Sequence, residues 1–289
     1  MQQANASENL LVLGTAQDGG YPHTGCSEDC CREAWKDSNQ KRLIASLAVL
    51  DGKDCFLIDI TPDFKYQLQL IEHHINEKPR ISGICITHAH LGHYMGLLDL
   101  GLEVMNTNEI PVYVMPKMKS FLENNAPFTQ LLELNNIHLF IIQENYPIDI
   151  FKDVKIIPFR VPHRNEYSET VGYRIQTSRH SVLYIPDIDS WDGWDTDINE
   201  LIKESDIALL DGTFYDKTEL KNRDVSAIPH PSIRESINFF SALDKMDRKK
   251  VNFTHLNHTN NVLREGSKER KDVIQQGFQI AYDGMAITI

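Results

Sequence analysis

Three histidines crowd into six residues at the end of an apolar run. His88, His90 and His93 follow residues 81–86 directly. Imidazole is the commonest neutral metal ligand, and a tight turn after a strand lets the first, third and sixth positions converge where a continuous strand would point them apart. We therefore interpret the cluster as metal ligands rather than as ordinary core or surface histidines.

Further candidate ligands stand where other strand-like runs end. Asp59, His163, Asp187 and His255 each follow such a run, and functional sites gather at strand ends. Each residue alone has another explanation, since the aspartates could bond the backbone in turns and His163 could lie on the surface beside Pro162. Their common placement favours one site.

A second group of soft ligands lies near the N-terminus. Cys26, Cys30 and Cys31 follow a glycine turn, and His258 comes three residues after His255. Three thiolates and one imidazole complete a tetrahedral zinc site, so we predict a structural zinc that ties an N-terminal loop to the active site. His23 is a rival fourth ligand, and the alternative is a set of reduced surface thiols.

The remaining cysteines and the odd count of five argue against a disulfide framework. Cys55 and Cys85 sit inside apolar strand patterns. We expect both to be buried core thiols.

Strand-like runs alternate with helical patterns along the chain. The predicted strands are residues 10–14, 45–49, 55–59, 81–87, 112–115, 138–142, 154–160, 171–176, 181–185, 207–211, 251–253 and 285–289. The predicted helices are residues 63–77, 96–105, 116–124, 198–204, 232–243 and 267–276. No linker or repeat divides the chain, so we predict a flexible N-terminus over residues 1–9 and one mixed α/β domain over residues 10–289. Two sheets between helices would bury this many strands.

Composition narrows the class of partner. The chain has 289 residues, a formal net charge of −12 and 41% hydrophobic residues. A shortage of clustered Lys and Arg argues against nucleic acid, and no apolar run is long enough to span a membrane. We expect a small-molecule substrate, which can be anionic because a metal cluster is a local positive site. The polar start leaves a cytoplasmic or a periplasmic location open, because a leader could have been removed, and a homodimer is left open as well.

The order of the candidate ligands resembles the metallo-β-lactamase superfamily. Asp59, His88-x-His90-x-x-His93, His163, Asp187 and His255 follow that family's order from about residue 10 to the C-terminus. Residues 11–20, 210–214 and 254–260 resemble the family of pyrroloquinoline quinone biosynthesis protein B, and the cysteines and histidines resemble PhnP phosphodiesterases. The resemblance implies an αββα four-layer sandwich.

The resemblance also implies a role for each candidate residue. His88, His90 and His163 would bind a first metal, His93 and His255 a second, and Asp187 would bridge them with a metal-bound hydroxide as nucleophile. Asp59 would orient a ligand histidine. His230 precedes a helix opened by Ser232, and in relatives a histidine there faces the substrate; it would be a general acid, or else an exposed loop residue.

One position departs from the family pattern. Gly92 stands where the motif has an aspartate that binds the second metal. That site could be empty, could recruit Asp211 or Asp18, or could hold iron through His93, His255 and Asp187, the two-histidine, one-carboxylate set of non-haem iron enzymes.

Three functions follow from these ligands. The first is a zinc- or manganese-dependent hydrolase of a small phosphodiester or related ester. The second is an iron-dependent oxidase or hydroxylase. The third is a non-catalytic zinc-binding protein.

Overall fold

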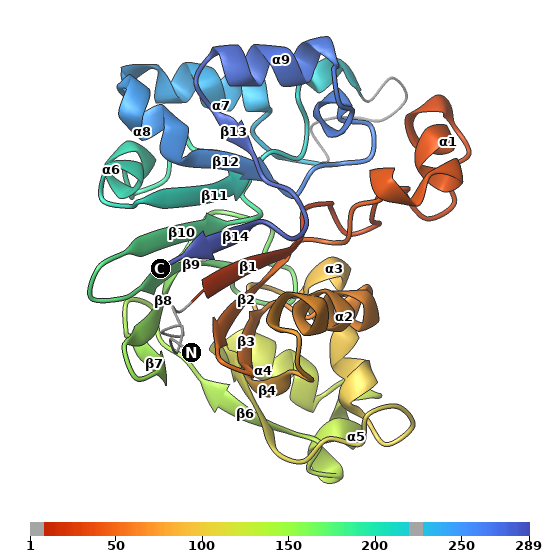
Figure 1. The fold of residues 1–289 in the computed structure, drawn as a ribbon. Helices are drawn as coiled ribbons and strands as arrows, with labels where there is room; N and C mark the ends of the chain where they lie inside the picture. The colour runs from red at the N-terminus through yellow and green to blue at the C-terminus, as the bar shows by residue number, and fades with distance from the viewer. Residues whose placement is uncertain (1–8, 220–227) are drawn as a thin grey trace, which may run out of the picture.

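The computed structural model describes residues 9–219 and 228–289, and its strands form two mixed sheets (Figure 1). The first sheet has the order β14-β1-β2-β3-β4-β5-β6. Its strands are β1 (Asn9–Gly14), β2 (Ser46–Asp51), β3 (Asp54–Ile58), β4 (Arg80–Cys85), β5 (Ile110–Val114), β6 (Ile137–Ile141) and β14 (Ala286–Thr288). The strands β14, β1, β2 and β3 pair antiparallel, and β3 to β6 pair parallel.

The second sheet has the order β13-β12-β11-β10-β9-β8-β7. Its strands are β7 (Ile148–Phe151), β8 (Val154–Arg160), β9 (Val171–Gln176), β10 (Ser181–Ile185), β11 (Ile207–Asp211), β12 (Val251–Thr254) and β13 (Gln279–Ile280). The strands β7 to β10 pair antiparallel and β10 to β13 pair parallel. The C-terminal ends of β8, β10, β11 and β12 therefore lie at one edge.

The central strands of each sheet are buried on both faces, which explains their nearly continuous apolar sequences. Successive side chains of a strand point to opposite faces. In β1, Leu10 and Val12 pack between the sheets, whereas Leu11 and Leu13 pack toward the helices. The cluster between the sheets also holds Tyr173 of β9.

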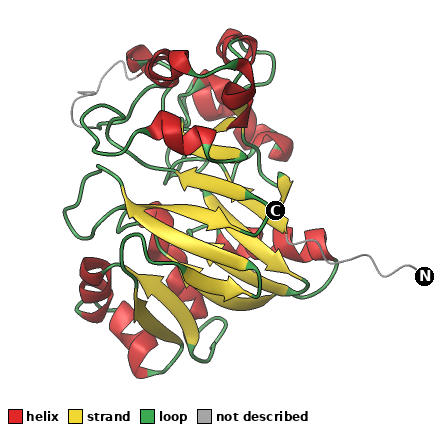
Figure 2. Ribbon diagram, turned by 90° about the vertical axis from the view of Figure 1, so that its left-hand side faces the viewer, coloured by secondary structure: helices red, strands yellow, loops and turns green. Residues whose placement is uncertain are grey.

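Helices cover the two outer faces and complete four layers (Figures 1 and 2). Over the first sheet lie α2 (Phe64–Ile75), α4 (Pro116–Glu123) and α5 (Phe128–Glu133). Over the second lie α6 (Ile198–Lys203), α7 (Ile233–Phe239), α8 (Lys245–Lys250) and α9 (Lys268–Gln275). The predicted αββα sandwich is confirmed. Among the described residues no helix is long and apolar enough to cross a membrane.

The predicted strands are present, with ends that differ by a few residues. The strand predicted over residues 81–87 ends at Cys85, so the following residues can turn into the site. Cys55 and Cys85 are buried, as predicted. The predicted flexible segment 1–9 lies outside the described residues except for Asn9, which begins β1.

Several helix predictions were wrong. Residues 96–105 form a 3₁₀ helix only over Met95–Leu100, after the one-turn α3 (Leu91–Tyr94). The helix predicted over 232–243 is divided into α7 and a 3₁₀ turn at Phe240–Ala242. The predictions missed β7, β13, α1 (Asp29–Lys36), α5 and α8, which are all short segments.

Candidate metal centre

The predicted ligands meet at one edge of the two sheets. Asp59 follows β3 and the histidine motif follows β4, while Asp187 follows β10 and His255 follows β12. Asp59 and His255 leave their strands in the left-handed conformation, with φ of 66° and 57°. Few non-glycine residues adopt this conformation, and here it breaks the alternation of the strand and turns the side chain into the site.

Four side chains form a first group of metal donors. His88, His90, His163 and Asp187 each offer one ligand atom, and these atoms lie within 4.8 Å of one another. The Nε2 atoms of His88 and His163 are both 3.3 Å from a carboxylate oxygen of Asp187. Nδ1 of His90 lies 3.1 Å from Nε2 of His163.

A second group adjoins the first through Asp187. Asp18, His93 and His255 place one ligand atom each within 4.8 Å of one another. Nε2 of His93 and Nε2 of His255 lie 4.0 and 3.9 Å from Oδ2 of Asp187. The Asp187 carboxylate therefore faces both groups, as a bridging ligand would.

Asp59 anchors two of the ligand histidines from behind. His93 donates from Nδ1 to Asp59 at 2.7 Å. His88 Nδ1 contacts the Thr87 hydroxyl at 2.9 Å, and that hydroxyl in turn donates to Asp59 at 3.0 Å. Asp59 is fully buried. Such partners fix the ring orientation and the tautomer, so that Nε2 faces the centre.

Two residues outside the predicted set anchor His163 and His255. His163 donates from Nδ1 to Asp189 at 2.7 Å, and Nδ1 of His255 contacts the Thr213 hydroxyl at 3.0 Å. Sequence reasoning missed both. Asp189 lies two residues beyond Asp187, and Thr213 belongs to the 210–214 motif, so adjacency to predicted ligands was the signal available.

Five inner atoms of this cluster have no hydrogen-bond partner among the described residues. They are Nε2 of His88, His93 and His255, Oδ1 of Asp187 and Oδ1 of Asp18. A buried polar atom without a partner costs about 1–3 kcal/mol. Because all of them converge as electron-pair donors, divalent cations satisfy them together, and the residues fit a metal centre.

Electrostatics within the cluster indicate the same requirement for positive charge. Burial by itself lowers the pKa of His93 and of His163, but Asp59 raises the pKa of His93 to about 9, and Asp187 raises that of His163 to about 10. Burial raises the pKa of Asp187, yet the surrounding histidines hold it well below its ordinary value. Without metal, protons on two histidines offset the buried carboxylates, and bound cations would replace those protons.

His230 lies beside this centre. Its Nδ1 is 2.8 Å from Oδ2 of Asp211 and 3.4 Å from Oδ1 of Asp187, and the side chain is buried rather than exposed in a loop. Burial lowers its pKa, but Asp211 and Asp187 outweigh burial and raise it. Ser232 caps α7 in a capping box with Glu235, which fixes the loop that carries His230.

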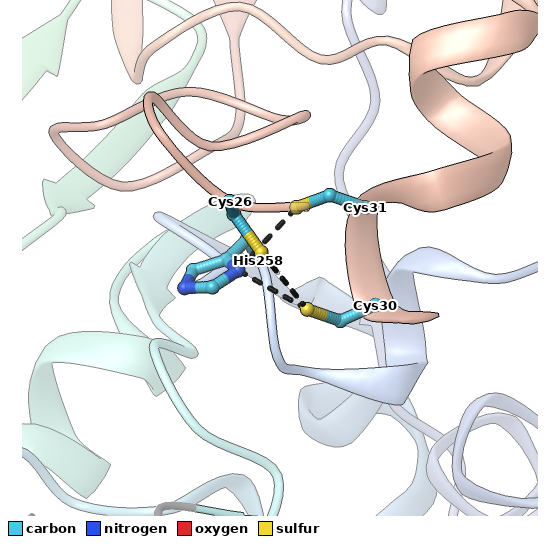
Figure 3. A group of neighbouring side chains, drawn as sticks. All are labelled: Cys26, Cys30, Cys31 and His258. Atoms are coloured by element: carbon cyan, nitrogen blue, oxygen red, sulfur yellow. Dashed lines mark hydrogen bonds between the residues drawn. The ribbon is translucent and has the colours of Figure 1, made fainter. Parts of the chain in front are cut away.

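The cysteine cluster forms a separate donor group with His258 (Figure 3). Sγ of Cys26 and Sγ of Cys30 are 3.4 Å apart, and both Cys30 and Cys31 place Sγ 3.4 Å from Nδ1 of His258. Zinc bonds of about 2.0–2.3 Å in a tetrahedron place neighbouring ligands roughly 3.5 Å apart. The four side chains therefore fit one zinc ion, and none of the cysteines is in a disulfide.

Two details of the cysteine cluster differ from the sequence interpretation. Cys30 and Cys31 belong to the first turn of α1 and not to a loop, so their rigid backbone aims both thiols. His258 completes the donor group, whereas the ring of His23 packs against that of His258 at 4.3 Å. Burial raises the pKa of Cys31 to about 12, so a thiolate there needs a bound cation.

A cavity of about 930 Å³ extends from Asp18 to His258. Phe214, whose ring lies 5.9 Å from that of His230, forms part of its wall. The described residues that line it include six carboxylates and no Lys or Arg; the acids are Asp18, Glu28, Asp29, Asp216, Glu219 and Glu269. The cavity wall is thus acidic, and bound metal would be its positive counterpart.

Comparisons with known proteins agree with this geometry. The profile of the beta-lactamase superfamily domain matches residues 55–256. Coenzyme PQQ synthesis protein B of Xanthomonas campestris pv. campestris (strain B100) is 26% identical over 308 residues, covering 97% of this chain and 99% of that protein. The corresponding protein of Acinetobacter baylyi is 25% identical over 312 residues, with the same coverage of both chains.

Two solved structures share the fold. Zinc-bound PqqB from Methylobacterium extorquens superimposes with a TM-score of 0.82 at 23% identity, over 97% of this chain and 100% of that one. A diphosphatase from the PhnP family gives a TM-score of 0.68 at 24% identity, over 97% and 96% of the two chains.

Proposed function

Because the chain belongs to the beta-lactamase superfamily, we propose that it is a metal-dependent hydrolase of a small phosphodiester or a related ester. One observation carries the proposal: two donor groups adjoin at Asp187, and five of their inner atoms have no hydrogen-bond partner among the described residues. Zinc or manganese in these groups would lower the pKa of a bound water and polarise a phosphoryl oxygen. His88, His90 and His163 would hold one ion, and His93 and His255 would hold the other.

The chain's own groups would position the ligands and supply a proton. Asp59 and Asp189 hold the outer nitrogens of His93 and His163, so ring rotation is restricted. Because Nδ1 of His230 is engaged by Asp211, Nε2 is the atom that would donate a proton to the leaving oxygen. The raised pKa of His230 favours the protonated form that a general acid requires.

An acidic cavity reaches the metal centre at Asp18, and the described part of its lining would repel a molecule with several negative charges. Two bound ions would attract one anionic group, which suits a substrate with a single negative charge at the reacting phosphodiester.

An iron-dependent oxidase or hydroxylase is the second candidate. It is supported by the similarity to the PQQ synthesis proteins and by a donor set of two histidines with carboxylate, which suits non-haem iron. The metal decides between the two functions, because oxygen chemistry needs a redox-active ion and hydrolysis does not. A zinc-binding protein without catalysis is the third candidate.

The first experiment is element-resolved metal analysis of protein purified anaerobically without added metal, followed by assays of bis(p-nitrophenyl) phosphate hydrolysis and oxygen consumption. If the protein is a hydrolase, the metal analysis should find zinc or manganese, and the protein should cleave bis(p-nitrophenyl) phosphate. His90→Ala should lose about one ion per chain and at least a hundredfold in rate, while His73→Ala, at an exposed position of α2, should keep both. Iron with oxygen consumption would favour the oxidase, and full metal occupancy with neither activity would favour the binding protein.

A further inference from the structure

The histidine motif lacks a carboxylate, and the structure offers one from a distant part of the chain. Gly92 lies between His90 and His93 with no side chain to bind metal. A Cβ at Gly92 would lie 2.2 Å from Oδ1 and 2.8 Å from Cα of Asp18. Both approaches are far inside van der Waals contact, so Asp18 already fills the space that a side chain at position 92 would need.

The carboxylate of Asp18 points to the donors of the second group. Its Oδ1 lies 3.6 Å from Nε2 of His93. Oδ1 of Asp18 and the Nε2 atoms of His93 and His255 have no hydrogen-bond partner among the residues that the structure describes. Nδ1 of each ring contacts Asp59 or Thr213, so Nε2 is the nitrogen that faces the centre. When Nε2 of His93 gives up its proton, the three atoms are convergent electron-pair donors, a set that suits a cation.

The backbone holds Asp18 in this place. Gln17 donates from its backbone N to the Leu256 carbonyl at 3.0 Å, and Leu256 donates back to Thr15 at 2.8 Å. The Asn257 amide also donates to the side chain of Gln17. Hydrogen bonds therefore hold the loop that carries Asp18 against the loop that carries His255.

We infer that Asp18 is the carboxylate ligand of the second metal ion. It replaces the aspartate that the family motif has at the position of Gly92. The inference rests on the metal-dependent function proposed above. His93, His255 and Asp18 would then hold the second ion, beside the Asp187 carboxylate that faces both donor groups. Gly92 is required because any side chain there would displace Asp18.

The test is a reciprocal exchange of the two residues. Wild type, Asp18→Ala, Asp18→Asn, Gly92→Asp and the double variant Asp18→Gly/Gly92→Asp are stripped of metal, reloaded with Zn²⁺ and analysed for zinc per chain. Anomalous scattering at the zinc edge in crystals assigns each ion to its site. Thermal unfolding and circular dichroism verify that each variant folds, and Asp51→Ala, at an exposed position, is the matched control.

Asp18→Ala and Asp18→Asn should lose about one zinc per chain, the ion at His93 and His255, and keep the ion at His88, His90 and His163. The double variant should regain it, and Gly92→Asp alone should be less stable than wild type. An occupied second site in both Asp18 variants would overturn the inference and leave the proposed function standing. A wild-type chain with zinc only at the first site would also overturn it. A wild-type chain with no zinc at either site would overturn the proposed function as well.

Discussion

At the scale of single residues, the site depends on which nitrogen of each imidazole faces inward. A histidine ring has two nitrogens, and an outer partner at one nitrogen assigns the other to the metal. His93 and His163 use carboxylates for this purpose, whereas His88 and His255 use threonine hydroxyls. Despite burial, Asp59 raises the pKa of His93 to about 9 and Asp187 raises that of His163 to about 10. Metal must displace these protons, so we expect it to bind more weakly as the pH falls.

We expect His230 to be a general acid and not a metal ligand. His230→Gln should keep the metal content of wild type and lower kcat about 10²–10⁴-fold, because a general acid contributes in that range. Metal analysis and steady-state kinetics check this expectation. His138→Gln, at an exposed position of β6, should change neither quantity. Loss of metal from the His230 variant would instead make His230 a ligand.

At the scale of elements, loops at the strand ends carry the ligands, and clamps between loops hold them in register. The cysteine cluster is one clamp, since it joins α1 to the loop after β12. Asp283 is another. It accepts hydrogen bonds from the Thr15 hydroxyl and the Leu43 backbone N, both at 2.7 Å, and so connects the turn before β14 to two loops of the first sheet.

Loss of one clamp cysteine should remove the structural ion selectively. Cys30→Ser should lower zinc by about one per chain and lower Tm, because the ion's binding free energy stabilises the fold. The ion at His88, His90 and His163 should remain. Cys55→Ala, which alters a buried thiol outside the cluster, should reduce stability without loss of zinc. Equal zinc in the Cys30 variant and wild type would rule out the clamp.

Asp283 should make stability depend on pH. Burial raises the pKa of Asp283 to about 6 from an ordinary value of 3.8. A raised folded-state pKa means that the folded protein binds the proton more tightly than the unfolded chain. The stabilisation is therefore complete below about pH 4 and is lost as the pH rises through about 6.

The expected change is about 2–3 kcal/mol in the free energy of unfolding between pH 4 and 7. Asp283→Asn should lack this component, because it does not titrate. Denaturant unfolding of wild type and Asp283→Asn at several pH values measures the difference between their free energies of unfolding. Groups that titrate alike in both proteins cancel in this difference. Parallel pH profiles for the two proteins would refute the assignment.

At the scale of the whole molecule, the two sheets must pack in one alignment for the centre to exist. Asp187 and His255 belong to the second sheet, whereas Asp59 and His88 belong to the first. Tyr173 connects the sheets, since its buried hydroxyl donates to the Ile86 carbonyl at 2.7 Å, two residues before His88. Tyr184 is buried in the same cluster, but its hydroxyl has no partner among the described residues.

These two tyrosines make a matched pair. Tyr173→Phe should lower the free energy of unfolding by about 1–2 kcal/mol, because the buried Ile86 carbonyl loses its donor. Tyr184→Phe should be neutral or stabilising, because it removes a buried group without a partner. Denaturant unfolding measures both. Equal effects from the two substitutions would show that the hydrogen bond between the sheets contributes nothing to stability.

Sequence alone was sufficient for features set by local chemistry. The strands were recognisable because each one is a short apolar run, which is the pattern of a strand buried on both faces of its sheet. The histidine motif and the cysteines were recognisable for the same reason, since their ligand types are crowded within a few residues. Short elements such as α5 and β7 were missed because four to six residues carry too little periodic signal.

Among the outer partners of the histidines, Asp59 was expected from the family resemblance, whereas Asp189 and Thr213 depended on long-range contacts that no spacing encodes. Gly92 left the second donor group incomplete in the sequence, with Asp18, Asp211, an empty site and an iron site as open alternatives. Only the tertiary structure brings Asp18 from the loop after β1 against Gly92 and sets Thr213 behind His255. The physical reason is that ligand types are a property of residues, whereas the space that a carboxylate can occupy is decided by the packing of loops from distant parts of the chain.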